Sequence, residues 1–276
     1  MKTINKILAE SRLFEILRDR LPNSIIDSDL YKKTADYLDL YVIENNLSIE
    51  EIITAYETYV STFNKHCKAF IRTGEYPLHL GTETPDISRE GYDLVLILSV
   101  LLTAHRFRIM EIIYNSGRSE GTRLFVGAGP GLELYLSESL DQNNYVYDVS
   151  LNEGLKKIFP KVKFFTDYFN TQYTDYFDSI FLIEILEHLE DPFELLANAH
   201  LALKESGVVY LTTATDIPQF DHLYNFTEDH TNFDLKVAEM GFEIELKEKV
   251  PHEYLLMKVN PSNHFYILKK KRTYEH

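Results

Sequence analysis

Hydrophobic residues recur at helical spacing through the first 118 residues of the chain. The clearest case follows Ser48, because Glu51 completes a capping-box pattern and apolar residues then return every three or four positions as far as Gly74. Similar spacing predicts further helices around Leu8–Leu17, over 28–45 and over 88–115. We therefore expect residues 1–118 to form an all-helical domain.

After Gly121 the pattern changes to short apolar runs that alternate with helical segments. The runs with the length of strands are 124–126, 145–149, 162–165, 178–183, 207–213, 242–246 and 265–269. Helices are expected over 132–140, 152–159, 192–204 and 231–240. Such alternation predicts a parallel sheet with helices on both faces, so residues 119–276 are expected to form an α/β domain.

The first predicted strand ends in three glycines at alternate positions. Gly127, Gly129 and Gly131 follow Leu124–Val126 and precede an apolar segment with helical character. Glycine accepts positive φ and lets another molecule approach the backbone closely, so this pattern is typical of a strand that turns into a helix beside a ligand. A tight turn without a ligand is the alternative interpretation of the same residues.

Acidic residues stand at the ends of the next predicted strands. Asp148 closes the second strand, Asp167 follows the third beside Tyr168, and Glu184 follows the fourth. Ligands of an open parallel sheet bind beyond the carboxyl ends of its strands. Asp148 is therefore suited to the hydroxyls of a ribose, and Asp167 with Tyr168 to an adenine. Each acid also has a local interpretation, as a helix cap or a solvated loop residue.

From Leu124 to about Leu268 the chain resembles the class I S-adenosylmethionine-dependent methyltransferases. The resemblance rests on the loop G-A-G-P-G, on the acid of Y-V-Y-D and, most specifically, on the fourth-strand motif E-x-L-E-H-x-x-D-P. It is similar in particular to the small-molecule type that includes the ubiquinone-biosynthesis O-methyltransferases. It implies a Rossmann-like sheet of seven strands, with the last strand inserted antiparallel between its neighbours. It also implies S-adenosylmethionine as cofactor and methyl transfer to an oxygen or nitrogen atom of a small molecule.

The same resemblance implies where each part of the cofactor would lie. The glycine loop would pass under its methionine part, Asp148 would hold the ribose, Asp167 with Tyr168 would frame the adenine, and Glu184 would line the sulfonium side. The full set of expected cofactor-binding residues is Val126, Gly127, Ala128, Gly129, Gly131, Asp148, Val149, Asp167, Tyr168, Glu184 and Ile185.

One position departs from the family pattern. The family usually has an acid two positions before the first glycine, and Phe125 occupies that position here. The segment F-V-G-A-G-P is closer to the loop of the nicotianamine-synthase-like enzymes, which also place a helical domain before a methyltransferase-like sheet. Those enzymes transfer the aminocarboxypropyl group of the same cofactor, which is the alternative activity. A non-catalytic S-adenosylmethionine-binding protein that acts through its helical domain is a further alternative.

Three histidines are candidate general bases for a hydroxyl or protonated amine acceptor. His188 belongs to the fourth-strand motif, whereas His222 and His230 follow the fifth strand, and a bystander role is the alternative for each. Arg106 is a candidate to bind a substrate carboxylate, although an internal salt bridge is equally open to it. Tyr224 is a candidate contact of the acceptor.

A divalent cation is an additional candidate cofactor. Glu184, Glu187 and His188 have metal-ligating groups at a spacing that resembles metal-assisted methyltransferases, among them small-RNA terminal 2′-O-methyltransferases. A cation there would polarise a substrate hydroxyl, and His222 or His230 would complete its shell. Relatives with this motif that bind no metal leave the question open.

Charge and composition narrow the range of partners. The formal net charge of −15 opposes binding to nucleic acid or to anionic membranes. The longest near-apolar run, 94–104, is shorter than the roughly 20 residues that cross a bilayer. Cys67 is the single cysteine, which fits a reducing cytoplasm. We expect a small-molecule acceptor, with the helical domain serving either as a cap over the active site or as a surface for homodimerisation.

Overall fold

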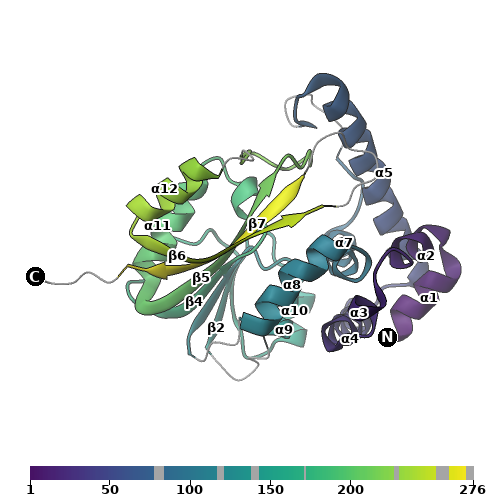
Figure 1. The fold of residues 1–276 in the computed structure, drawn as a ribbon. Coiled ribbons are helices and arrows are strands. Elements are labelled where there is room, and N and C mark those ends of the chain that lie inside the picture. The colour runs from purple at the N-terminus through teal and green to yellow at the C-terminus, as the bar shows by residue number, and fades with distance from the viewer. Residues whose placement is uncertain are drawn as a thin grey trace, which may run out of the picture.

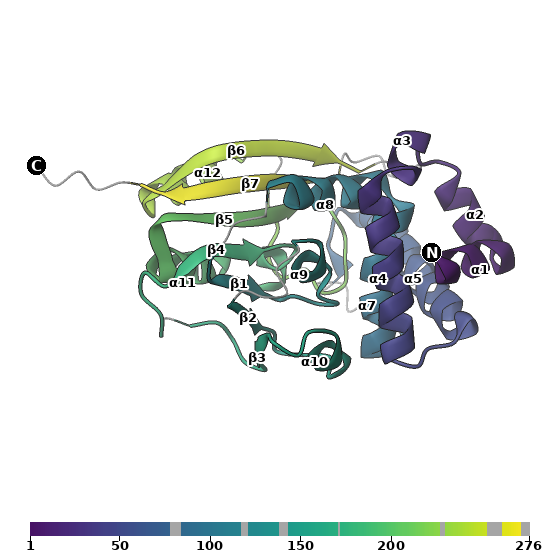
Figure 2. The same cartoon turned by 90° about the horizontal axis from the view of Figure 1, so that it is seen from below.

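The computed structural model describes residues 1–77, 84–116, 121–137, 143–170, 172–226, 230–252 and 261–271. A seven-stranded mixed sheet carries a layer of helices on each face (Figures 1 and 2). The strands are β1 (Arg123–Val126), β2 (Asn144–Tyr147), β3 (Lys163–Phe165), β4 (Phe177–Leu182), β5 (Leu203–Thr215), β6 (Phe242–Pro251) and β7 (Ser262–Lys270).

Helices dominate the chain before the sheet. They are α1 (Lys2–Glu10), α2 (Arg12–Arg18), α3 (Asn23–Ile26), α4 (Asp29–Glu44), α5 (Ile49–Thr73), α7 (Arg89–Leu102) and α8 (Ala104–Ser116). Those between and after the strands are α9 (Leu132–Leu136), α10 (Gly154–Ile158), the 3₁₀ turn η1 (Leu186–His188), α11 (Pro192–Ala202) and α12 (Thr231–Glu239). Among the residues described, no helix is both long and apolar enough to cross a bilayer.

The sheet has the strand order β3-β2-β1-β4-β5-β7-β6. The pairs among the first five strands are parallel, whereas β7 runs antiparallel to both β5 and β6. This arrangement confirms the expected Rossmann-like sheet of seven strands with an inserted antiparallel strand. It also places the carboxyl ends of β1, β2 and β4 side by side at one edge of the sheet.

Alternating side chains of each strand divide the core into two layers. Phe125 of β1 packs toward the N-terminal helices and stacks on Phe181 of β4 at a ring distance of 4.5 Å. Its neighbours Leu124 and Val126 pack on the opposite face, in the same core as the buried residues of α11 and α12. Helices α4 and α7–α10 cover the first face, and α11 and α12 cover the second (Figure 2). Phe125 is therefore a core residue.

Two of the expected helices are interrupted. The helix predicted over 88–115 is in fact α7 and α8, because Thr103 between them adopts an extended conformation (φ −135°, ψ 134°). Ser11 is extended in the same way and separates α1 from α2 (φ −127°, ψ 121°). Hydrophobic spacing missed both breaks, because the apolar face continues in each half.

The capping box at the start of α5 is confirmed. Ser48 Oγ accepts a hydrogen bond from the Glu51 amide, and Glu51 Oε2 accepts one from the Ser48 amide at 2.8 Å. Gly74 ends the helix in a left-handed conformation (φ 72°). The expected domain boundary at 118/119 and the end of the helix predicted over 132–140 lie outside the described residues.

Candidate active site

A cavity of about 1070 Å³ lies between the carboxyl ends of the strands and the N-terminal helices. Its sheet side includes the glycine loop after β1 and the residues at the ends of β2 and β4, and its helical side is formed by α2, α5, α7 and α8. Pockets for small ligands typically have volumes of roughly 300–1,000 Å³, so this cavity has room for a nucleoside cofactor together with a second small molecule.

The glycine loop follows β1 in left-handed conformations. Gly127, Gly129 and Gly131 have φ values of 65°, 50° and 74°. A Cβ atom on Gly127 would lie 2.6 Å from Cδ1 of Ile185, in the turn after β4, so the loop passes close to that turn. The sequence prediction that this segment needs glycine is therefore explained by both backbone conformation and packing.

Asp148, at the end of β2, braces the glycine loop. Its Oδ2 accepts a hydrogen bond from the Gly129 amide at 3.1 Å, and its Oδ1 accepts one from the Ser150 amide at 2.9 Å. Nη2 of Arg89, on α7, lies 3.6 Å from the same Oδ2. The carboxylate keeps free lone pairs, because each oxygen can accept two hydrogen bonds. It therefore joins β1, β2 and the helical layer at the wall of the cavity.

The residues expected to bind the cofactor come together at this cavity. All of them line it except Gly131. Gly131 instead starts α9, and a Cβ atom there would lie 3.0 Å from the ring of Phe159. Glycine is favoured at position 131 because φ is positive there and because a side chain would lie against Phe159. The roles of the other ten residues remain predictions, but their shared location is the one those roles require.

Glu184 is fixed at the end of β4 in a strained conformation. It has a φ of 52°, which is uncommon for a residue other than glycine. Its Oε2 lies 2.6 Å from Nη1 of Arg106, and its Oε1 accepts a hydrogen bond from Asn263 at 2.7 Å. Arg106 thus forms an internal salt bridge, which was one of its two expected roles, while it also lines the cavity.

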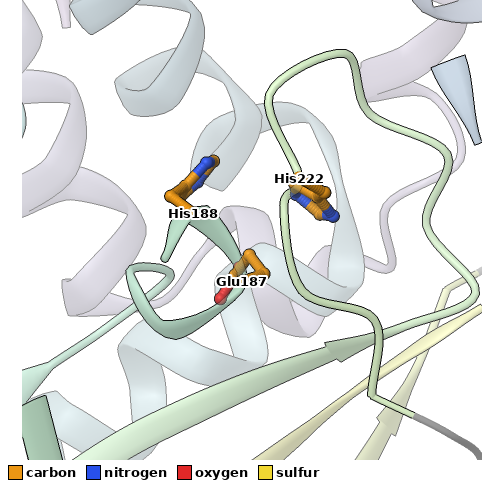
Figure 3. A group of neighbouring side chains, drawn as sticks. All are labelled: Glu187, His188 and His222. Atoms are coloured by element: carbon orange, nitrogen blue, oxygen red, sulfur yellow. The ribbon is translucent and has the colours of Figure 1, made fainter. Parts of the chain in front are cut away.

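Glu187, His188 and His222 form a cluster at the cavity wall (Figure 3). Glu187 and His188 belong to η1, and His222 lies in the loop after β5. Burial, together with the nearby charge of Glu184, raises the pKa of Glu187 well above its usual range. Burial lowers the pKa of His222 well below its usual value, which keeps its ring neutral.

Two of the expected residues lie away from the cavity lining. Nε2 of His230 is 2.8 Å from the hydroxyl of Thr213, and its ring packs 3.8 Å from that of His264. Tyr224 packs its ring against Phe193 and Phe226 instead. Neither residue is part of the cavity lining. The loop after β5 brings only His222 of the two expected histidines to the site.

Sequence reasoning missed several residues that line the cavity. His105 of α8 and His252, just after β6, stack with a ring distance of 3.8 Å. Burial lowers the pKa of His252 to about 4. Arg89 and Tyr92 of α7 also line the cavity. These residues meet partners that are distant in the sequence, so local patterns do not reveal them. The one available indication was that His105 is adjacent to Arg106, a candidate site residue.

Comparisons with known proteins agree with this architecture. Residues 108–241 match a family described as a methyltransferase domain. The structure of the 1,6-didemethyltoxoflavin-N1-methyltransferase of Burkholderia thailandensis, with bound 1,6-didemethyltoxoflavin and S-adenosylhomocysteine, is 16% identical, with a TM-score of 0.52 over 69% of this chain and 94% of that one. No curated protein sequence matches the chain.

Two further solved structures share the fold at low identity. One is a candidate methyltransferase of Haloferax volcanii in complex with the Trm112 methyltransferase activator, with 11% identity, a TM-score of 0.52, and coverage of 68% of this chain and 97% of that one. The other is a candidate sarcosine dimethylglycine methyltransferase of Galdieria sulphuraria, with 11% identity, a TM-score of 0.50, and coverage of 60% and 86%. The finer resemblance to ubiquinone-biosynthesis enzymes stays a prediction. Residues 108–241 therefore match a methyltransferase domain, and the chain has the Rossmann-like fold of these structures, preceded by a helical region.

Proposed function

We propose that the protein transfers a methyl group from S-adenosylmethionine to an oxygen or nitrogen atom of a small molecule. The observation that carries this proposal is the meeting of ten expected cofactor-binding residues at one cavity of a methyltransferase domain. These residues come from four separate strand ends, which the parallel sheet brings to one edge, and they supply there the glycine loop and the carboxylates that the cofactor needs. The Burkholderia thailandensis structure holds both S-adenosylhomocysteine and 1,6-didemethyltoxoflavin, which supports a role for this cavity in binding a cofactor and an acceptor together.

The cofactor is proposed to lie along the sheet side of the cavity. Asp148 would accept hydrogen bonds from the ribose hydroxyls through the lone pairs that the Gly129 and Ser150 amides leave free. Asp167 and Tyr168 would frame the adenine; the side chain of Tyr168 is well exposed here (68%), as expected of a ring that a ligand would cover. Glu184 would lie on the sulfonium side, held in place by Arg106.

The acceptor is proposed to occupy the helical side of the cavity. Apolar and aromatic side chains form this wall, among them Leu17 of α2, Tyr59 and Phe63 of α5, and Tyr92 and Leu96 of α7. Such a wall favours a largely apolar or aromatic molecule, because burial of apolar surface supplies most of the binding free energy. The reacting atom would face Glu187, His188 and His222, the polar groups between the two sides.

Methyl transfer to this acceptor is an in-line displacement. A lone pair of the acceptor atom forms the new bond to the methyl carbon while the carbon–sulfur bond breaks, and sulfur keeps that electron pair to give S-adenosylhomocysteine. The protein mainly supplies positioning, and a hydroxyl acceptor must also lose its proton. Aminocarboxypropyl transfer remains the second candidate, because the F-V-G-A-G-P loop favours it.

A glycine substitution tests the placement of the cofactor. Gly127→Ala is expected to weaken binding of S-adenosylhomocysteine roughly tenfold or more in calorimetry, because the new methyl group displaces Ile185 and the loop beneath the cofactor. Gly74→Ala is the matched control: Gly74 also has positive φ (72°), but nothing lies within 4 Å of its added Cβ and it is remote from the cavity lining. Equal affinities for the two variants would contradict the placement.

A further inference from the structure

The cluster of Glu187, His188 and His222 has the composition of a metal site. One potential ligand atom from each residue lies within 4.8 Å of the other two. Figure 3 shows Glu187 and His188 on one turn and His222 on the neighbouring loop. Ligands of one tetrahedral ion lie roughly 3.4 Å apart, so small side-chain rotations would bring the three atoms onto one ion.

One buried carboxylate oxygen of Glu187 has no hydrogen-bond partner among the described residues. The residue is only 1% exposed, and the unpaired atom is its Oε2. Buried polar atoms nearly always have a partner in folded proteins, so an unpaired carboxylate oxygen points to a missing one. A cation is the partner that would also stabilise the charged form of a buried carboxylate.

The ring of His188 is oriented as a metal-binding imidazole commonly is. Nδ1 of His188 is 3.1 Å from the backbone carbonyl oxygen of Asp221, to which it can donate a hydrogen bond, leaving the lone pair on Nε2. The ring of His222 packs edge-on against that of His188, with the ring centroids 5.2 Å apart. Metal-binding histidines commonly donate their second ring N–H to a carbonyl or carboxylate in this way, because it fixes the tautomer and the ring orientation.

Glu184, which the sequence placed in the metal shell, is committed elsewhere. One of its oxygens pairs with Arg106 and the other accepts a hydrogen bond from Asn263. An ion at Glu184 would need both contacts to break. His230 is excluded for another reason, since it packs beside Thr213 and His264 outside the cavity lining. The structure thus narrows the set of ligands to Glu187, His188 and His222.

We propose that Glu187, His188 and His222 bind a divalent transition-metal ion in the acceptor side of the cavity. One carboxylate and two imidazoles suit Mn²⁺, Fe²⁺ and Zn²⁺. Three protein ligands would leave coordination positions open for a further ligand, and all three residues line the cavity. The role of the ion rests on the proposed function: an ion here lowers the pKa of a bound hydroxyl group, so the acceptor is a hydroxyl-bearing molecule.

Calorimetric titration of the chelator-treated full chain with MnCl₂ and with ZnCl₂ tests this site. The wild type is expected to bind one ion of at least one of these metals per chain. Glu187→Gln and His222→Ala are expected to weaken that binding about 100-fold or more, because each removes a direct ligand. His230→Ala is the matched control, since it removes a buried histidine outside the cavity and is expected to bind the ion as the wild type does.

Two further measurements keep the outcome interpretable. Thermal unfolding shows whether each variant is folded, and Glu187→Gln preserves the shape of the side chain if His222→Ala does not fold. Failure of the wild type to bind either ion stoichiometrically would overturn the proposal, as would equal binding by Glu187→Gln. Titration of the wild type with S-adenosylhomocysteine separates the two claims. If the wild type binds S-adenosylhomocysteine but neither ion, the metal site alone is refuted. If it binds neither S-adenosylhomocysteine nor an ion, the proposed function is refuted as well.

Discussion

Asp148 braces the glycine loop and places a carboxylate at the wall of the cavity. One carboxylate accepts hydrogen bonds from Gly129 and Ser150 while Arg89 approaches it from α7. A residue in this position serves two purposes, because it fixes the loop and still offers lone pairs to a ligand. The sequence indicated the second purpose only, since hydrogen bonds to a distant backbone amide leave no local pattern.

Replacement of Asp148 tests its role in binding. Asp148→Ala is expected to weaken S-adenosylhomocysteine binding by about 1–3 kcal/mol, because ribose hydroxyls and the Gly129 amide lose their acceptor. Titration calorimetry measures this, with Asp178→Ala as the control; Asp178 also pairs with backbone and lysine groups but is absent from the cavity lining. An unchanged affinity in Asp148→Ala would show that the ribose lies elsewhere.

At the same scale, the sequence predicted residues next to strand ends far better than residues on long connections. Val126, Asp148, Asp167 and Glu184 each follow or close a strand, and a parallel sheet brings its strand ends together wherever the loops go. His222 and His230 were equivalent in the sequence, because both follow the fifth strand. In the structure, His222 lines the cavity, whereas His230 stands at the start of α12 and packs against His264 of β7.

Helices α4 and α7 are tied to the loop after β2 by a single buried carboxyl group. Asp93 of α7 accepts hydrogen bonds from the Tyr41 hydroxyl at 2.7 Å and from Asn152 at 3.3 Å, and Arg89 lies 3.1 Å from it. Periodicity predicted α4 and most of α7, but it gave no indication of this polar contact within an apolar helix face. Three elements far apart in the sequence meet there, which is why the sequence alone did not reveal it.

The buried Asp93 makes stability depend on pH. Burial raises its pKa to about 6, against an ordinary value of 3.8 in the unfolded chain, so the folded state holds its proton more tightly. The stabilisation is complete below pH 3.8, the pKa of Asp93 in the unfolded chain, and it is lost as the pH rises through about 6, its pKa in the folded protein. The free energy of unfolding is expected to fall by up to about 3 kcal/mol over this range. Denaturant unfolding at pH 4 to 7 measures it.

Asp93→Asn isolates this effect from the other acids. The variant cannot titrate at this position. As pH rises from 4 to 6, the unfolding free energy of the wild type is therefore expected to fall relative to that of the variant. Above pH 7 the difference should level off, because Asp93 is then ionised in both states. A difference that stays constant across this range would mean that Asp93 has an ordinary pKa in the folded protein.

In the whole molecule, the N-terminal helices cover the ligand edge of the sheet. Tyr37 of α4 donates a hydrogen bond to the carbonyl of Pro130 in the glycine loop, and Tyr59 of α5 bonds Gln219 in the loop after β5. The helical region therefore supplies one wall of the cavity, in keeping with the expected cap. Its use as a surface for homodimerisation stays a prediction.

The sequence predicted a parallel α/β sheet and the helical region before it, and the family resemblance implied the antiparallel last strand, but neither could predict where the sheet and the helices meet. Alternating strands and helices are visible in the local pattern, whereas the contact between α4 and the glycine loop joins residues more than 90 positions apart. For the same reason, helical spacing predicted α5 and α7 but not which of their side chains line the cavity.

The nucleoside product of turnover tests the central claim most directly. The full chain is incubated with S-adenosylmethionine and a pool of small hydroxyl- and amine-bearing metabolites, with and without MnCl₂, and the nucleosides are separated by liquid chromatography and mass spectrometry. Methyl transfer predicts that S-adenosylhomocysteine accumulates together with a product heavier by one methylene unit. Accumulation of methylthioadenosine instead would contradict methyl transfer and would establish transfer of the aminocarboxypropyl group.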